Sequence, residues 1–190
     1  HPFDSIQEGI DAVAEQGTVI VHAGRYIETI QVSTKGITVT AEWLADSSVL
    51  AASILDADGT GPAASFTSLE GTNCRRVGLT IGGGKSPTAA AIFCEHANPV
   101  ISHCLISGNM ATAAGGAVVV CRDSQARFIN CTISGNRTGV GGAVLSFADS
   151  EAIVLNSIIW DNDGASLGVK SGLSPQVLYS DVEGGTPGLG

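Results

Sequence analysis

The sequence has few charged and few aromatic residues, and no long apolar run. Charged residues make up 14% of the 190 residues and aromatic residues 5%. The nine lysines and arginines are outnumbered by 18 acidic residues, and the net charge is −9. Nucleic-acid-binding proteins carry clustered basic residues instead. No stretch approaches the ~18 consecutive apolar residues of a membrane-spanning helix. The composition therefore argues against nucleic-acid binding and against a membrane span.

Recognisable catalytic and metal-binding motifs are also missing. The sequence has no C-x-x-C pair and no H-E-x-x-H pattern, and its four histidines do not form a group. These absences argue against a zinc site and a thioredoxin-like redox site. We therefore predict no cofactor, with calcium as the one candidate.

A repeat is present in place of such motifs. The segments PVISHCLISGN (99–109), ARFINCTISGN (126–136) and AIVLNSIIWDN (152–162) align at successive offsets of 27 and 26 residues. Weaker copies precede and follow them, at 75–84 and 176–185. Self-similarity at a period of about 20–50 residues predicts a solenoid.

A second motif lies between these segments and completes each period. AAAIFC (89–94), GAVVVC (116–121) and GAVLSF (142–147) align with one another. The apolar segments are short, rich in Val, Ile, Phe and Thr, and bounded by turn-forming residues, which is typical of strands. Two or three strands in every ~26 residues, with no helical pattern between them, predict a coil of parallel strands stacked ~4.8 Å apart.

Such stacking places equivalent residues of successive rungs above one another. Asparagines at the corners can then bond one another from rung to rung and tolerate a left-handed backbone. We predict aliphatic and amide columns made of Ile106, Ile133 and Ile159, of Asn109, Asn136 and Asn162, and of Asn130 and Asn156, with His103 at the equivalent position.

The motifs GGAVVVC (115–121) and FINCTISGN (128–136) resemble the GGG-I-x-C and x-I-x-N-C-x-I-x-G-N repeats of the right-handed parallel β-helix family, which has the pectin-lyase-like fold. The resemblance is strongest to bacterial secreted and surface proteins. The segments 5–32 and 177–185 resemble the first and late rungs of the same proteins. The resemblance implies an all-β, right-handed parallel β-helix and a secreted or cell-surface location.

We predict one β-helix domain over residues 1–190. Ser5 and Glu8 form an S-x-x-E capping box, followed by an amphipathic face that predicts a short helix over the N-terminal end of the core. No matching cap is visible at the other end, where the open edge predicts self-association. The predicted parts are a capping helix at 5–16, about seven rungs of 23–27 residues at 17–185, and a Gly-rich tail at 186–190.

Five cysteines leave two readings open. The repeat places Cys94 over Cys121 and Cys104 over Cys131, while Cys74 lies outside both columns. Free cysteines behave as small apolar residues in a core, so the stacks can be buried thiols. The alternative is rung-to-rung disulfides, although parallel side-chain directions give a poor disulfide dihedral.

Enzymes of this family usually act on acidic polysaccharides, so the resemblance implies clustered carboxylates, often holding calcium, with an Arg or Lys as base. The best candidate column is Glu95, Asp123 and Asp149, where two aspartates of successive rungs would lie about 5 Å apart and bind a cation. The alternative is structural, because Asp-Ser is a common corner. Arg122, Arg127 and Arg137 are candidates to neutralise a uronate, and the alternative is that they are solvated residues near acidic corners.

We favour a non-catalytic extracellular or cell-surface scaffold, structural or adhesive, that contacts carbohydrate or assembles end to end into filaments. The alternative is a polysaccharide lyase or glycoside hydrolase that acts on acidic glycans through the face of Asp123 and Asp149. A third reading is that the chain is one segment of a longer surface protein. The sequence leaves enzymatic activity undecided.

Overall fold

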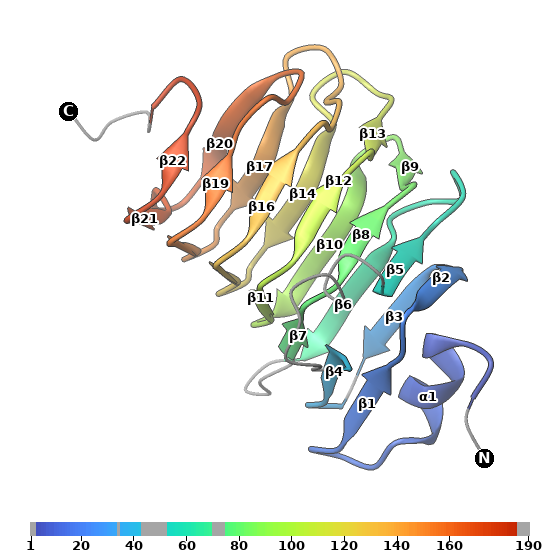
Figure 1. Cartoon of the computed structure of the whole chain (residues 1–190). Coiled ribbons are helices and arrows are strands. Elements are labelled where there is room, and N and C mark those ends of the chain that lie inside the picture. The colour runs from blue at the N-terminus through green and yellow to red at the C-terminus, as the bar shows by residue number, and fades with distance from the viewer. Residues whose placement is uncertain (1–2, 34, 43–52, 70–74, 186–190) are drawn as a thin grey trace.

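The chain winds into a parallel β-helix whose short strands stack along one axis (Figure 1). The computed structural model describes residues 3–33, 35–42, 53–69 and 75–185. Cys74 lies outside the described residues. Every strand pair within the sheets is parallel, for example Ile106 of one coil with Ile133 of the next. The predicted fold class, an all-β parallel β-helix with one short N-terminal helix, is confirmed.

Three long sheets form the walls of the coil. Sheet 1 contains, in spatial order, β1 (Thr18–Val21), β4 (Thr38–Ala41), β7 (Arg75–Val77), β11 (Val100–Ser102), β15 (Arg127–Ile129), β18 (Ile153–Leu155) and β21 (Gln176–Leu178). Sheet 2 contains β2 (Gly24–Ile27), β5 (Ser53–Asp56), β8 (Thr80–Gly82), β12 (Leu105–Ser107), β16 (Thr132–Ser134), β19 (Ile158–Ile159) and β22 (Asp181–Val182).

The third wall has longer strands and one strand fewer. Sheet 3 contains β3 (Ile30–Ser33), β6 (Ala64–Leu69), β10 (Ala89–Ala97), β14 (Ala117–Arg122), β17 (Ala143–Ala148) and β20 (Ala165–Ser171). A small fourth sheet pairs β9 (Lys85–Ser86) with β13 (Met110–Ala111). In the described part of the chain, two sheets of seven strands and one of six make six coils with three strands each and a last coil with two. The predicted number of about seven rungs is therefore slightly high.

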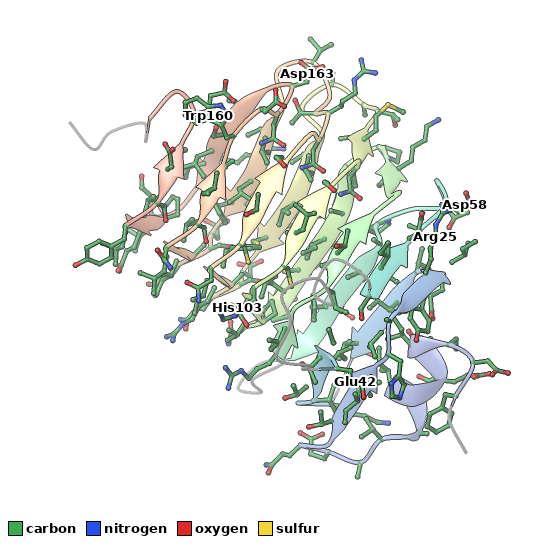
Figure 2. The ribbon with its side chains drawn as sticks, viewed as in Figure 1. Arg25, Glu42, Asp58, His103, Trp160 and Asp163 are labelled. Carbon is green, nitrogen blue, oxygen red and sulfur yellow. The ribbon has the colours of Figure 1, made fainter. Side chains whose placement is uncertain are left out.

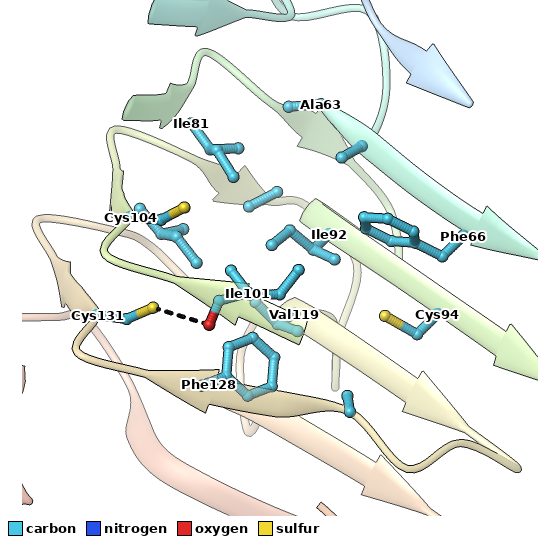
Figure 3. Close-up of a cluster of buried hydrophobic side chains, with 14 of the residues drawn as sticks. Ala63, Phe66, Ile81, Ile92, Cys94, Ile101, Cys104, Val119, Phe128 and Cys131 are labelled. Carbon is cyan, nitrogen blue, oxygen red and sulfur yellow. Dashed lines mark hydrogen bonds between the residues drawn. The ribbon is translucent and has the colours of Figure 1, made fainter. Parts of the chain in front are cut away.

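Alternate residues of each strand point into the coil and form one continuous core. The sequence alternates in strands such as β3 because successive side chains of a strand point to opposite faces, whereas β14 and β17 of sheet 3 are buried over most of their length. Ile81, Ile106, Ile133 and Ile159 pair in register across sheet 2, and all four are fully buried. Large side chains from the other walls, such as Phe66 and Phe128, fill the space between the sheets (Figure 3).

The helix α1 (Ile6–Ala12) lies at the N-terminal end of the coil, beside β1 and β3 (Figure 1). It is shorter than the predicted 5–16, because Val13 already has an extended backbone (φ −70°, ψ 142°). Ser5 Oγ accepts the Glu8 N–H at 3.1 Å, as in a capping box. The Glu8 carboxylate, however, accepts the N–H of Asp4 rather than that of Ser5.

Two charged side chains of the first coil fix both ends of α1. The Glu28 carboxylate accepts the N–H groups of Ile6 at 2.7 Å and Gln7 at 2.9 Å. The Lys35 ammonium donates to main-chain carbonyls at the other end, including that of Asp11 at 2.8 Å. An anion at the N-terminus and a cation at the C-terminus of a helix satisfy its unpaired groups and complement its dipole. The sequence pattern that predicted the helix contains neither of these partners.

Candidate functional site

Polar side chains recur at the corners of the coil, where they form hydrogen bonds with the equivalent side chains of neighbouring coils. Asn109, Asn136 and Asn162 form one ladder inside the corner that follows sheet 2. Asn109 Nδ2 donates to Asn136 Oδ1 at 3.0 Å, and Asn136 Nδ2 donates to Asn162 Oδ1 at 2.9 Å. Each amide also bonds main-chain groups, and Asn109 and Asn136 are 1% exposed. These amides serve the stacking of coils.

A second ladder runs along the outside, at the corner between sheets 1 and 2. Asn156 Nδ2 donates to Asn130 Oδ1 at 2.6 Å, and Asn130 Nδ2 lies 2.9 Å from His103 Nε2. All three residues have a left-handed backbone, with φ of 53°, 54° and 49° in chain order. His103 thus takes the place of an asparagine, and Figure 2 shows it at the edge of the molecule, well separated from Arg25 and Asp163.

The four described cysteines lie in two stacked pairs. Cys94 pairs in register with Cys121 in sheet 3, and Cys104 lies one coil from Cys131. All four are buried and are thiols rather than disulfides. Figure 3 shows Cys104 and Cys131 on neighbouring coils of the core. Burial, with a smaller contribution from the neighbouring Cys104, raises the pKa of the Cys131 thiol to about 12. A thiol in this state is a poor nucleophile.

Serines continue the column that Cys104 and Cys131 begin. The Cys131 N–H donates to Ser157 Oγ at 3.1 Å, and the Ser157 N–H donates to Ser180 Oγ at 3.0 Å. Each of these side chains also donates back to the carbonyl oxygen two residues before it, as Ser157 does to Leu155 at 2.9 Å. Cys131 donates in the same way to Ile129 O at 3.5 Å. The thiol therefore occupies a position at which a hydroxyl makes the same bonds.

The predicted column of carboxylates is wrong at Glu95, which lies one residue away from the level of Asp123. Glu95 pairs in register with Arg122, so His96, and not Glu95, lies level with Asp123. Asp123 lies level with Asp149, since its N–H donates to the Ala148 carbonyl. Successive residues of a strand point to opposite faces, so a shift of one position removes Glu95 from the column.

Asp123 and Asp149 lie at left-handed corners, with φ of 46° and 48°. The serines that follow them form a buried ladder of their own, in which the Ser124 N–H donates to Ser150 Oγ at 3.3 Å. Asp149 Oδ2 accepts from Ser171 Oγ at 3.0 Å. Among the described residues, no three His, Cys, Asp or Glu side chains are grouped so that they could hold a metal ion. Calcium binding at the two aspartates stays a prediction.

Surface ion pairs are scattered along the coil. His22 pairs with Glu42 at 2.7 Å near the N-terminal end, and Arg137 lies 3.6 Å from Asp163 near the other end. Figure 2 shows Glu42 and Asp163 far apart. Exposed pairs of this kind contribute only about 0–1 kcal/mol. The three candidate arginines lie on different walls, since Arg122 ends β14 of sheet 3, Arg127 begins β15 of sheet 1 and Arg137 follows β16 of sheet 2.

A groove on the outer face of sheet 3 brings together side chains that no single motif contains. Arg122 points outward because Cys121 beside it points inward, and Lys170 of β20 lines the same groove. The groove has a volume of about 120 Å³, and its walls are the loops that precede β10 and β14. Its other polar lining side chains are Thr88 and Ser146, and the main chain of Gly115 and Gly116 forms part of its wall.

The neighbours of Arg122 hold its guanidinium in place over the groove. Its Cζ atom lies 5.5 Å from the centre of the Phe93 ring, and one terminal nitrogen lies 3.7 Å from Glu95 Oε1. Cation–π contact with an aromatic face favours this position and leaves guanidinium donors available. Lys170 is exposed. In a protein of net charge −9, this groove therefore carries two cationic groups on one face.

Sequence reasoning named Arg122 as a candidate but missed Lys170 and the groove. Lys170 is the extra residue at an irregularity in the pairing of β17 with β20, where Phe147 pairs with Val169 but Ala148 pairs with Ser171. The repeat therefore has no equivalent position that could have marked Lys170. The walls come from loops at 87–88 and 113–116, and only the second lies near either cation in sequence, a few residues before Arg122.

Comparison with known proteins gives a single structural likeness at low identity. No family model matches the chain, and no curated protein matches it. The crystal structure of pectin methylesterase from Aspergillus niger, in deglycosylated form, is similar with a TM-score of 0.45 and 13% identity, over 98% of this chain and 84% of that one. A likeness at this level does not identify a function. No described helix is long and apolar enough to cross a membrane.

Proposed function

We propose that this protein is an extracellular β-helix scaffold that contacts acidic carbohydrate through the groove of Arg122 and Lys170. The observation that carries the proposal is the presence of two cations on one face of a strongly acidic protein. Guanidinium and ammonium groups bind carboxylates by charge-assisted hydrogen bonds. The wide, shallow face of a sheet suits a polymer that lies across several strands. Secretion is part of the proposal, since acidic polysaccharides are extracellular.

The neighbouring groups fit a sugar ring as well as its charge. Phe93 supports the guanidinium from one side and is itself partly exposed. Ser146 supplies a hydroxyl to the groove. Gly116 also lines the groove, and its main chain lies so close to Pro87 that a side chain there would collide with the Pro87 carbonyl. Sugar sites combine such an apolar surface with a few polar groups that set orientation.

Affinity electrophoresis in gels that contain polygalacturonate tests this proposal, with neutral dextran as the comparison polymer. The variants Arg122→Gln and Lys170→Gln should each lower the apparent affinity about 5–10-fold, as expected for loss of one exposed charge-assisted contact. Arg127→Gln is the matched control, because Arg127 is also exposed but lies on sheet 1. Equal retardation of all four proteins, or none for the unmodified protein, would reject the groove as a carbohydrate site.

The same samples test the alternative, an enzyme of acidic glycans. Formation of unsaturated uronate ends or new reducing ends would indicate a lyase or a hydrolase. In that case Asp123→Asn and Asp149→Asn should abolish turnover, and asparagine retains the left-handed backbone at both corners. Binding without turnover favours the scaffold.

We further propose that the scaffold associates through its last coil. Val177 and Val182 continue the core columns but are only partly buried, and Leu178 beside them is 45% exposed. The strands β21 and β22 are the outer strands of sheets 1 and 2 in the described part of the chain. Outer strands with exposed apolar side chains favour pairing with another chain.

A further inference from the structure

We infer that the surface that receives this last coil is the opposite end of a second copy of the chain, where β21 pairs with β1 in a single register. The inference rests on the proposed self-association and adds the partner surface and its alignment. Three features of the two ends carry it: hydrogen-bond directions, core columns, and the placement of α1.

The hydrogen bonds of β21 define which of its groups face outward. Gln176 donates to Ala152 O, and Leu178 O accepts from the Asn156 N–H, so both residues bond β18. Alternate residues of a parallel strand bond the same neighbour. The N–H and C=O of Val177 therefore face away from β18, toward the end of the molecule.

The hydrogen bonds of β1 present the matching groups at the other end. Gly17 O accepts from the Thr38 N–H, and Val21 O accepts from the Glu42 N–H, so the residues at 17, 19 and 21 bond β4. The N–H and C=O groups of Thr18 and Ile20 then face outward. Val177 of one copy fits between them, its N–H donating to Thr18 O and its C=O accepting from the Ile20 N–H. In this register Val177 lies level with Val19.

The same register joins the core columns. Val177 is level with the buried Val154, and Val19 is level with the buried Val39, so a Val177–Val19 pair would extend one column through the junction. In sheet 2, Tyr26 and Val182 are the partly buried ends of the other column. An apolar cleft of about 250 Å³ lies at this edge between α1, β1 and Tyr26. A second copy would cover these groups from water.

The helix α1 packs against both β1 and β3, with Gly9 directly against Val19, so a second copy has to fit beside it. Gln7 Oε1 accepts the Gln31 N–H at 2.8 Å, and Gln7 Nε2 donates to Gln31 O at 3.3 Å, so the helix closes the edge of β3 in sheet 3. Sheet 3 also ends one coil early at the other end of the molecule, at β20. The two ends therefore have matching steps. At the N-terminal end α1 extends beyond β3, and at the other end β21 and β22 extend beyond β20 (Figure 1).

The register brings two exposed side chains face to face and so gives a charge-pair test. Ile20 is 58% exposed and Leu178 is 45% exposed, and both would lie level on the outer face of the junction. The variants Ile20→Lys and Leu178→Glu each place a charge at one end only. Because both side chains are exposed, neither substitution should disturb the fold, which far-UV circular dichroism and thermal unfolding check.

Sedimentation velocity over a concentration series measures the outcome. We expect the unmodified protein to form chains, and each variant alone to weaken association at least 10-fold. An equimolar mixture of the two variants should form heterodimers through the two unaltered ends, and the junction between the altered ends, which pairs Lys with Glu, should extend them into alternating chains. Val140→Lys, an exposed residue in the loop after β16, is the control that should leave association unchanged.

Each other outcome identifies what fails. A monomeric unmodified protein at all concentrations would reject self-association and the junction together. Association that Leu178→Glu weakens but Ile20→Lys does not would retain the role of the last coil and overturn β1 as its partner. Dimers of Ile20→Lys alone, at the strength of the unmodified protein, would indicate pairing between two C-terminal ends and would equally overturn the inference.

Discussion

Removing one amide from the inner asparagine ladder should destabilise the protein far more than removing one from the outer ladder. Asn136 is 1% exposed, and its Oδ1 accepts the Asn109 N–H at 3.1 Å. Its Nδ2 donates to Ile106 O at 2.8 Å and to Asn162 Oδ1 at 2.9 Å. In Asn136→Ala, the main-chain N–H of Asn109 and the carbonyl of Ile106 lose these partners inside the coil.

The expected magnitude follows from the number of buried groups left unpaired. Each unsatisfied buried donor or acceptor costs about 1–3 kcal/mol, so two of them predict a loss of about 2–6 kcal/mol in the free energy of unfolding. That loss is a large share of the ~5–15 kcal/mol that stabilises an ordinary domain. Equilibrium unfolding in urea, followed by circular dichroism, measures it as a change in midpoint and slope.

Asn156→Gly is the matched control in the outer ladder. Asn156 also donates to the asparagine of the preceding coil, but the bond is exposed, and glycine retains the left-handed backbone at φ 49°. We expect a loss below about 1 kcal/mol. If Asn136→Ala costs no more than Asn156→Gly, buried amide ladders do not stabilise the stack, and the assignment of these asparagines to a purely structural role loses its energetic basis.

Two further predictions concern packing inside the coil. The pKa of the Cys131 thiol is raised from its usual 9.0 to about 12, so the folded state holds this proton more tightly than the unfolded state does. The stability that this difference provides is fully present below pH 9 and is lost as the pH rises toward 12. Urea titrations at several pH values should therefore show a steeper loss of stability for the unmodified protein than for Cys131→Ser, which otherwise retains the ladder bonds. Gly139→Ala should unfold the protein at a clearly lower temperature, because its Cβ would overlap the Ala113 carbonyl oxygen. Gly135→Asn should shift the midpoint only slightly, since the space around Gly135 is open and asparagine tolerates its φ of 65°.

The sequence was sufficient to predict the features that recur in every coil. Residues that align between repeats, such as Ile106 with Ile133 and Cys94 with Cys121, are the residues that pair in register. A repeat carries this information because each coil contacts only its neighbours and so presents the same environment again. The fold class and the composition of the inner columns could therefore be predicted before any coordinates were known.

The same reasoning failed where the structure departs from the repeat. Glu95 was aligned one residue away from its true level, because the polar residues at the ends of the sheet 3 strands carry no apolar alternation to fix their phase. Lys170 was missed because it is the extra residue at an irregularity in β20 and has no partner in the neighbouring strand β17. The partners of α1, Glu28 and Lys35, lie in the first coil, where no second copy of the segment exists for comparison.

These departures coincide with the places where function is proposed, and there is a physical reason for the coincidence. Inward positions and most described corners are committed to the core and to ladders, so a side chain there cannot change without a cost in stability. Outward positions of the sheets and the two ends of the coil are under no such constraint. Arg122 lies level with Glu95 and Ala148, and Lys170 has no partner in the neighbouring strand β17. Ile20 and Leu178 are apolar although exposed. A residue that breaks the repeat on an outward face needs a reason other than stacking, and contact with another molecule supplies one.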